Sequence, residues 1–472
     1  MSRAVVIGAG VGGLAAAIRL AEAGHDVEVH ERASSPGGKL GRYERDGFRF
    51  DTGPSLLTLP HVFTDLGLSL PLVALDPVVR HFFPDGTVLD SSSSHETFLD
   101  RIATALGPGA AADWHRFWRR AERIWHASWR SVLRRPVTPA TLAALSWRLT
   151  DLAAIAPGRT LRHLGYRYLR DPRLRMLLDR YATYAGADPR HAPAALAAIP
   201  YAELAFGGWY LPGGLTTLAD AMVARGEALG ARLVLDSEVT AVEPAGIRAG
   251  DTFVPADVIV SDVDALTLYR DLLPTPGRLP ALTDRSLAGF VLLLAVRGET
   301  PELAHHNVFF PTYYDAEFDA IFGSPARRAR PADDPTIFVT RANDPTVHPP
   351  GAEAWFVLVN APRHGASWSA TDWRRPGLAD SYADHILGLL AQRGLDVRDR
   401  VLFREIRTPA DLAAATATPG GAIYGTTGAL LRPANRGPSD NLFLVGGSVH
   451  PGGGLPMVAL SAQIAVTQIG PA

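Results

Sequence analysis

The segment that ends at Glu31 constrains the fold more than any other part of this chain. A short apolar run at 4–7 leads into a glycine-rich turn, and alanines and leucines from 14 to 23 indicate a helix. A second strand-like segment at 27–30 ends in Glu31. The order strand, glycine turn, helix, strand and acid predicts a dinucleotide-binding unit. The glycines of the turn are Gly8, Gly10, Gly12 and Gly13.

Each part of this unit has a physical role. Gly8 permits a tight turn, Gly10 lets the backbone approach a pyrophosphate, and Gly13 allows the helix to pack closely on the strand. The helix N-terminus presents free N–H groups and a positive dipole end to the phosphates. Glu31 lies where a carboxylate accepts hydrogen bonds from ribose hydroxyls. The segment therefore predicts a nucleotide cofactor.

A second glycine-rich turn lies near the other end of the chain. A buried-type strand at 442–445 precedes it, and an apolar helix from 458 to about 469 follows. Gly447 lies in the turn, and Pro456 suits the first turn of the helix. The positive end of this helix can stabilise negative charge on a reduced cofactor ring. The alternative is a glycine turn that only closes the fold.

Two short segments after Glu31 favour FAD over a nicotinamide cofactor. Residues 36–39 read PGGK and residues 50–54 read FDTGP, which resembles the two-domain flavoproteins related to glutathione reductase and the amine oxidases. In those proteins the glycine pair runs along the pyrophosphate toward the flavin. The resemblance implies FAD contacts from Arg32, Gly38, Lys39 and Gly53. No second strand, glycine turn, helix and acid unit is present to hold a separate nicotinamide.

The stretch VGGSVHPGGGLPMVALSA at 445–462 resembles the C-terminal signature of bacterial phytoene-desaturase-type carotenoid oxidoreductases. Further similar blocks at 171–193, 207–215 and 305–309 extend the resemblance over nearly the whole chain. Met457 follows Pro456 where many phytoene desaturases carry glycine, a departure more similar to the hydroxycarotenoid desaturase branch. Pro456 and Met457 then contact the flavin by resemblance.

The resemblance implies a function as well as a fold. It implies FAD-dependent desaturation of a long isoprenoid, such as phytoene or a hydroxycarotenoid, with oxygen or a quinone as electron acceptor and peripheral association with a membrane. The alternatives are a saturase, isomerase or terminal-methyl oxidase of the same superfamily, an amine oxidase, or a non-catalytic flavoprotein that carries carotenoids.

The expected architecture is α/β, a two-domain FAD-binding flavoprotein. We expect a discontinuous Rossmann-type nucleotide domain from 1–70, 213–285 and 420–472. The remaining segments, 71–212 and 286–419, are expected to form an inserted substrate domain with an antiparallel sheet and helices. Residues 230–242 are expected to return to the nucleotide sheet, and Val239 lies near the adenine by resemblance.

Residues 113–135 form an unusual amphipathic segment. At helical spacing, Trp114, Trp118, Trp125 and Trp129 fall within roughly a 60° arc. Arginines cluster on the opposite side: Arg116, Arg119, Arg123, Arg130 and Arg134. A tryptophan face beside arginines is typical of an interfacial membrane helix. The alternative is a core helix that buries its aromatic face in the substrate domain.

Composition excludes several classes of function. The formal net charge is -2, so no basic field points to nucleic acid. Cysteine is absent, which removes disulfides, thiolate metal sites and cysteine nucleophiles, so redox chemistry requires a cofactor. No metal site is expected, because His305 and His306 lack metal-ligand spacing and a third ligand. The chain shows neither a long apolar span nor a secretory signal, which favours a cytoplasmic location.

The catalytic residues are not evident from the sequence. Hydride can pass to flavin N5, and the accompanying proton can leave to a base or to water. His450 and Asp51 are the candidates for that base. A structural role in the neighbouring turn is the more common role for each of them.

Overall fold

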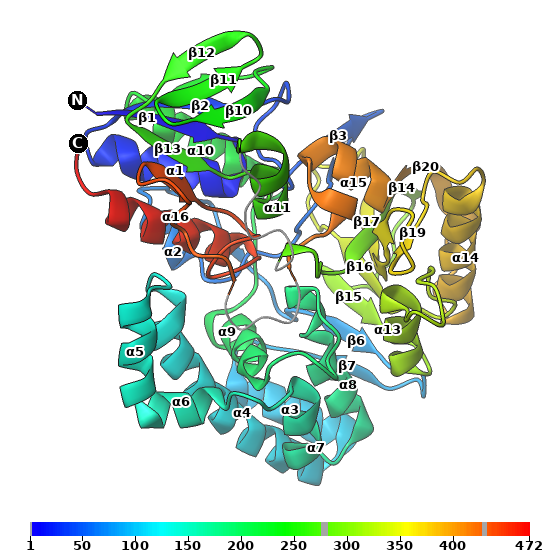
Figure 1. The fold of residues 1–472 in the computed structure, drawn as a ribbon. Helices are drawn as coiled ribbons and strands as arrows, with labels where there is room; N and C mark the ends of the chain where they lie inside the picture. The colour runs from blue at the N-terminus through cyan, green and yellow to red at the C-terminus, as the bar shows by residue number, and fades with distance from the viewer. Residues whose placement is uncertain (1, 275–281, 427–431) are drawn as a thin grey trace.

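The protein is described by a computed structural model that covers residues 2–274, 282–426 and 432–472. Figure 1 shows three groups of elements: a sheet with its helices near the chain termini, a second large sheet, and a layer of helices below them.

A five-stranded parallel sheet contains the N-terminal segment. The strand order is β21-β13-β1-β2-β9, and every pair is parallel. Apolar side chains at 4–7 of the central strand are buried, as expected for a parallel strand covered on both faces. The strands are β1 (Arg3–Ile7), β2 (Asp26–His30), β9 (Arg232–Val234), β13 (Val258–Ser261) and β21 (Leu442–Leu444).

Helices α1 (Val11–Glu22) and α16 (Leu455–Ile469) pack side by side along this sheet, although they come from opposite ends of the chain (Figure 1). Helix α10 (Thr216–Ala228) packs against α1 as well. The predicted strand, turn, helix and strand at the N-terminus and the strand, turn and helix at the C-terminus are therefore present.

One predicted strand belongs elsewhere. We expected residues 239–242 to return to the nucleotide sheet, but that return is made by β9. Val239 instead begins β10 (Val239–Glu243), which pairs with β11 (Gly246–Ala249) and then β12 (Thr252–Pro255) in a separate antiparallel sheet. Gly246 begins β11 in close contact with β12, since a Cβ atom there would lie 2.1 Å from the Val254 carbonyl oxygen. Strand periodicity alone does not say which sheet a strand joins.

A seven-stranded sheet forms the second group, in the order β20-β14-β17-β16-β15-β6-β7. Its pairs are antiparallel except β15 with β6, so the predicted antiparallel sheet is present in mixed form. Helix α14 (Leu378–Gln392) packs on this group. The strands are β6 (Arg80–Phe82), β7 (Val88–Asp90), β14 (Ala288–Arg297), β15 (His306–Phe309), β16 (Ile337–Arg341), β17 (Ala352–Ala361) and β20 (Val401–Arg407). The exact domain boundaries stay a prediction.

Residues 95–206 supply the helical layer at the bottom of Figure 1. The hydrophobic core is continuous from the nucleotide sheet into this layer. Its main helices are α3 (His95–Leu106), α4 (Pro108–Ser128), α5 (Pro139–Trp147), α6 (Leu149–Ile155), α7 (Leu161–Tyr168), α8 (Pro172–Arg180) and α9 (Ala198–Phe206). Across the described ranges, we find no helix with the length and apolarity needed to cross a bilayer.

The tryptophan face of α4 points into the protein. Trp114 is completely buried, Trp125 is 4% exposed, and Trp118 packs against the rings of His95 and Tyr201. The core alternative therefore describes Trp114 and Trp125, whereas Trp118 and Trp129 are half-buried, and a membrane contact of this segment stays a prediction. An interfacial pattern and a buried aromatic face have the same helical periodicity, which is why the sequence left both open.

Candidate functional site

The two glycine turns meet at one point of the molecule. A Cβ atom at Gly12, at the start of α1, would lie 2.9 Å from the backbone nitrogen of Gly446 in the C-terminal turn. The N–H of Gly446 in turn donates to the Ser461 hydroxyl of α16 at 2.8 Å. The start of α1, with its free N–H groups and positive dipole end, therefore lies next to the first residue of the C-terminal turn, which is held on the second turn of α16.

The N-terminal turn has the geometry that its glycines predict. Gly8 has a φ of 95°, a conformation that favours glycine. A Cβ atom at Gly13 would lie 2.0 Å from the Gly8 carbonyl oxygen, so only glycine permits this close packing. Glu31 is buried and accepts the N–H of Ala9 at 2.7 Å and that of Ala33 at 2.9 Å. Its carboxylate thus fixes the turn, and its contact with a ribose stays a prediction.

Asp262 lies inside this turn, and the sequence analysis missed it. Its carboxylate oxygens would lie 2.3 Å from a Cβ atom at Gly10 and 2.4 Å from one at Gly12. The pKa of Asp262 is raised to about 7, mainly by burial and also by the charge of Glu31, while the N–H of Gly13 and the charge of Lys39 oppose the rise. The residue follows strand β13, so its position depends on a strand far away in the sequence.

The predicted glycine and lysine segment lies beside the same turn. Gly37 donates its N–H to the Ala9 carbonyl at 2.8 Å, and a Cβ atom at Gly38 would lie 3.3 Å from the Gly10 Cα. Gly53 lies directly against this segment, since a Cβ atom added at Gly53 would lie 1.9 Å from the Lys39 carbonyl oxygen. Gly38, Lys39 and Gly53 are therefore brought together with the glycine turn.

Arg32 and Val239 lie at the edge of this arrangement. The Arg32 guanidinium donates to the Ala414 carbonyl at the end of α15 (Pro409–Thr416), away from the turn. Val239 is buried two residues after Ser237, whose N–H donates to the Glu31 carbonyl at 2.8 Å. The structure thus places Val239 near Glu31 and uses Arg32 to hold two surface segments together.

A cluster of cations lies between the two turns. Lys39 donates to the carbonyls of Ala422 at 3.2 Å and Ile423 at 2.8 Å, and its enclosure lowers its pKa to about 8. Arg285 is buried and pairs with Asp264 at 2.5 Å. Arg432 donates to the Gly447 carbonyl at 3.1 Å, and burial lowers its pKa to about 10. Arg285 and Arg432 carried no motif, so the sequence analysis missed both.

The C-terminal turn joins the helical layer through His450. The His450 ring nitrogen Nε2 lies 3.1 Å from the Val132 carbonyl oxygen, and its pKa is lowered by burial. Asn435 donates to the His450 carbonyl at 2.8 Å. His450 therefore acts as a structural link in this structure. Pro456 and Met457 lie in the first turn of α16. A Cβ atom added at Gly447 would lie 3.5 Å from the Cα of Gly453.

Asp51 caps a helix. Its carboxylate accepts the N–H of Leu215 at 2.7 Å and that of Thr216 at 3.1 Å, which are the first amides of α10. Burial raises its pKa to about 6, opposed by these amide donors. Asp51 thus has the turn-building role that the sequence analysis set beside catalysis.

A buried polar cluster lies one aromatic ring away from the C-terminal turn. Tyr424 provides that ring: a Cβ atom at Gly453 would lie 2.3 Å from it, and one at Gly186 would lie 3.1 Å from it. Beyond it, Arg180 of α8 donates to the Tyr184 hydroxyl at 2.7 Å. We name Arg180, Tyr181, Tyr184 and Glu203 the Arg180 cluster.

The Arg180 cluster is incompletely satisfied. Glu203 of α9 accepts the Tyr181 hydroxyl at 2.8 Å, and it is 2% exposed while Arg180 is 5% exposed. Arg180 Nη1 and Glu203 Oε2 have no hydrogen-bond partner among the described residues. Buried charged groups without partners are costly, so both atoms are free to bind a polar group of a ligand. These residues carry no recognisable motif, and the sequence analysis missed them.

The residues present fit an FAD. The Gly10 and Gly12 backbone and the start of α1 form a cradle for a pyrophosphate, with Lys39 and Arg432 nearby. Arg285 Nε and Nη1 are buried and lack a hydrogen-bond partner in the described part of the chain. The carboxylate of Asp262 opposes an anion here, and its raised pKa reduces that opposition at neutral pH and below.

Comparisons with known proteins agree with this cradle. A family model described as flavin containing amine oxidoreductase matches residues 11–300. A 4,4'-diapolycopene oxygenase from Methylomonas sp is 34% identical, over 98% of this chain and 97% of its own length. A 4,4'-diaponeurosporene oxygenase from Staphylococcus haemolyticus is 31% identical (97% and 95%), and a 1-hydroxycarotenoid 3,4-desaturase from a Flavobacterium species is 29% identical (98% and 98%).

Solved structures show the same fold at low identity. An oxidoreductase from Methanosarcina mazei superposes with a TM-score of 0.64 at 19% identity, covering 98% of this chain and 99% of that one. A putrescine oxidase variant gives a TM-score of 0.63 at 15% identity, covering 99% and 98%. The fold and site thus define an FAD-dependent oxidoreductase. The chain belongs to the flavin containing amine oxidoreductase family and, within it, to the phytoene-desaturase-type carotenoid oxidoreductases.

Proposed function

We propose that this enzyme oxidises a long, acyclic carotenoid or a closely related isoprenoid, and that the reaction is desaturation. Curated relatives that act on such compounds by their names match this chain over almost its whole length. Bound FAD supplies the hydride acceptor for this chemistry. Both a phytoene-like and a hydroxylated carotenoid fit this proposal, and the Pro456–Met457 pair favours the hydroxycarotenoid branch.

The cofactor contacts are part of this proposal. We assign the pyrophosphate to the cradle of Gly8, Gly10, Gly12 and Gly13, and the adenosine side to Glu31, Arg32 and Val239. The flavin side is assigned to Gly38, Lys39, Gly53, Gly447, Pro456 and Met457. The meeting of the two glycine turns at Gly12 and Gly446 supports this assignment.

The single observation that carries the proposed substrate side is the Arg180 cluster beyond Tyr424. It lies next to the C-terminal turn, inside the protein, with one free cationic and one free anionic atom. Tyr181, Tyr184 and Tyr424 surround these charges with aromatic surface. We propose that the aromatic surface contacts the polyene and that Arg180 orients an oxygen atom at its end.

This cluster also favours a second candidate, the oxidation of a terminal carbon. A hydrocarbon end offers no partner for Arg180 Nη1, whereas an alcohol or aldehyde oxygen accepts its hydrogen bond. The two oxygenases among the relatives are also more similar to this chain than the desaturase is, at 34% and 31% against 29% identity. Desaturation and terminal oxidation differ in product and not in the hydride-accepting cofactor.

Oxygen or a quinone is proposed as the electron acceptor, because nothing in the described residues repeats the N-terminal nucleotide-binding unit. A polyene gains roughly 25 cal/mol per Å² on leaving water, whether it enters lipid or the apolar interior of the enzyme. It therefore stays in the lipid, and a cytoplasmic enzyme that takes it from there must associate with a membrane surface. We therefore propose peripheral membrane association.

Anaerobic mixing of the FAD-loaded enzyme with carotenoids in detergent tests the function. We expect an acyclic carotenoid to bleach the flavin absorbance and to yield a product that lacks two hydrogens. A product that carries oxygen after air is admitted would instead establish terminal oxidation. Bleaching by amines alone would establish an amine oxidase, and carotenoid binding without bleaching would establish a carrier.

A further inference from the structure

A pocket rich in arginine lies on the helical layer, outside the site described above. It has a volume of about 530 Å³ and forms where α4, α6 and α7 meet. Four arginines line it: Arg120, Arg123, Arg159 and Arg167. Ala153, Ala156, Leu164 and Tyr168 supply the rest of its wall, so the pocket carries positive charge on an apolar base.

The positive charge of this arginine pocket is not neutralised within the protein. Arg120 donates to the Ala154 carbonyl at 2.5 Å, but within the described ranges none of the four arginines forms an ion pair with an acid. The pKa of Arg120 is lowered, first by burial and then by Arg123, Arg159 and Arg167. Four like charges around one pocket repel each other, and a bound anion removes that repulsion.

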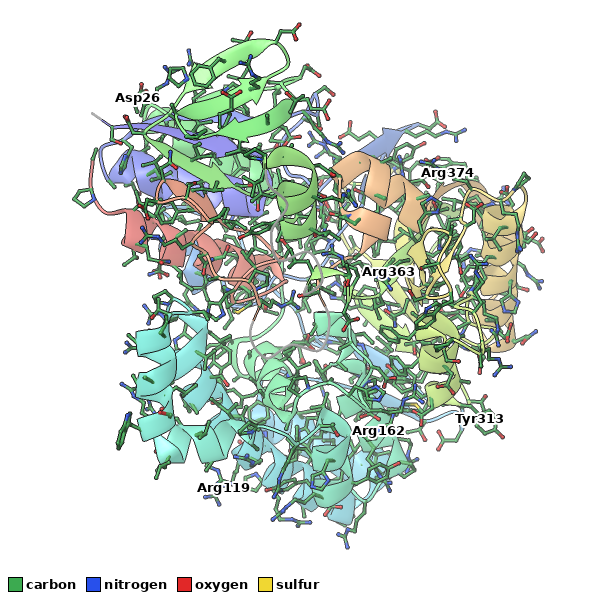
Figure 2. The ribbon with its side chains drawn as sticks, in the orientation of Figure 1. Asp26, Arg119, Arg162, Tyr313, Arg363 and Arg374 are labelled. Atoms are coloured by element: carbon green, nitrogen blue, oxygen red, sulfur yellow. The ribbon has the colours of Figure 1, made fainter. Side chains whose placement is uncertain are left out.

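The positive surface continues along α4. A second pocket of about 350 Å³ shares Arg123 and is lined also by Arg116, Arg119 and Glu122. These residues are the arginine side of α4, opposite its buried tryptophans. In Figure 2, Arg119 lies at the edge of the helical layer, with its side chain pointing away from the protein.

An exposed apolar edge lies next to the arginine pocket. Trp147 is 86% exposed and Leu149 is 71% exposed, where α5 ends and α6 begins. Helix α5 contains no charged residue, and Ala153 of α6 and Ala156 directly after it belong to the pocket wall. Figure 1 shows α5 and α6 at the outer edge of the helical layer.

We propose that the arginine pocket binds the phosphate group of an anionic phospholipid, while Trp147 and Leu149 enter the lipid beside it. A guanidinium binds phosphate oxygens with paired N–H donors. Tryptophan prefers the headgroup layer, and arginines beside apolar side chains are typical of surfaces that lie on anionic membranes. The membrane is the occupant because a soluble phosphate compound leaves the exposed Trp147 and Leu149 without a partner.

This inference rests on the proposed function only for its biological purpose, namely the collection of a lipid-soluble substrate. The surface itself depends on charge, exposure and the pocket. Binding to vesicles therefore tests it without any carotenoid, and flavin reduction in detergent tests the proposed function without any membrane. A failure to bind vesicles would overturn the proposed membrane association and leave the proposed reaction standing, and a failure of flavin reduction would leave the membrane surface standing.

Sedimentation of the FAD-loaded enzyme with vesicles is the test. We compare phosphatidylcholine vesicles with vesicles that also contain phosphatidylglycerol, and expect binding to the anionic vesicles that weakens with salt. The double variant Arg159→Gln/Arg167→Gln should reduce the partition coefficient about tenfold or more, because each arginine near an anionic surface contributes about fivefold. Both side chains are exposed, so the fold should persist.

The matched control removes the same charge elsewhere. Arg374 and Arg375 are exposed, and Figure 2 shows Arg374 on the opposite side of the protein from Arg119. Arg374→Gln/Arg375→Gln should bind the anionic vesicles like the wild type, and Trp147→Ser should weaken binding to them as well. Equal partition of the two double variants would overturn the proposal. Pocket-dependent binding of inorganic pyrophosphate without vesicle binding would also overturn it, by showing a soluble phosphate ligand.

Discussion

The cofactor side and the substrate side of this enzyme are built by different means. On the cofactor side, backbone atoms form most of the site. Glycines allow the start of α1 to approach the C-terminal turn, where Gly12 lies against Gly446. On the substrate side, side chains form the site: Arg180 and Glu203 come from two helices and meet in the core beyond Tyr424. Backbone sites leave a readable motif in the sequence, whereas side-chain sites assembled across the fold do not.

The comparison also explains where charge is placed. The cofactor side concentrates cations, with Lys39, Arg285 and Arg432 near the C-terminal turn. The substrate side balances one cation with one anion, Arg180 with Glu203, among tyrosines. A site for a charged nucleotide and a site for a mostly apolar polyene should differ in this way, because only the first must neutralise phosphate charge.

The largest effect is expected on the cofactor side. Gly13→Ala places a Cβ atom 2.0 Å from the Gly8 carbonyl oxygen, so the turn must move. We expect FAD affinity to fall roughly 100-fold, which flavin absorbance after gel filtration measures. Gly388→Ala is the control, because no heavy atom lies within 4 Å of its Cβ position in α14. If both variants keep FAD equally, the backbone does not build this side of the site.

On the substrate side, removal of the single charge of Arg180 should change the KM for carotenoids. Arg180→Gln should raise the KM for an acyclic carotenoid with an oxygenated end about tenfold, since a hydrogen bond from a charged donor contributes roughly 1.5–3 kcal/mol. The KM for a hydrocarbon carotenoid should change less than about twofold by the same argument. Arg175→Gln on the same helix is the control. Equal effects on both substrates would show that Arg180 acts on the fold and not on an oxygen atom.

Asp262 should make FAD binding depend on pH. Burial raises the pKa of Asp262 in the folded protein to about 7, above the ordinary aspartate value of 3.8, so between these pH values the folded protein keeps a proton that the unfolded chain has lost. The contribution of Asp262 to the free energy of unfolding therefore falls as pH rises from about 4 to about 7. Above pH 7 the carboxylate also repels the pyrophosphate, and FAD affinity should fall roughly tenfold between pH 6 and pH 8.

Asp262→Asn separates this effect from the rest of the cradle. The variant should bind FAD with nearly constant affinity over that pH range, measured by fluorescence titration of the apoprotein. Its melting temperature at pH 8 should exceed that of the wild type, because the amide carries no charge to bury. The same pH slope in wild type and variant would show that another group controls cofactor binding.

The smallest effect is expected at His450, which links the two sides. His450→Gln should lower the free energy of unfolding by about 1 kcal/mol, the usual net value of one hydrogen bond, as measured by urea denaturation. The pH profile of flavin reduction should stay unchanged, because burial lowers the pKa of His450 and keeps the ring neutral. Loss of an ionisation from that profile would identify His450 as a catalytic base after all.

The sequence predicted the cofactor side well because its elements are local. Gly8, Gly10 and Gly13 lie in one short turn, and the helix after them continues the same pattern. The strand at 239–243 was placed in the wrong sheet, because alternation of side chains does not identify a partner strand. The periodicity of α4 predicted a tryptophan face but not its direction.

On both sides of the site, residues that only the fold brings together lay beyond sequence reasoning. Asp262, Arg285 and Glu203 follow no motif, and only the fold brings them to the site. A lone buried acid or arginine in a helix resembles any other charged residue until its neighbours are known. The arginines of α4 were recognised, but the pocket also needs α6 and α7, which no periodicity within α4 reveals.

A crystal structure of the purified enzyme after incubation with FAD tests the central claim most directly. We expect one FAD per chain, with its pyrophosphate against Gly10 and Gly12 and its flavin beside Gly447 and Gly453, facing Tyr424. Protein that stays colourless, or a nucleotide bound away from the junction of α1 and α16, would contradict this account.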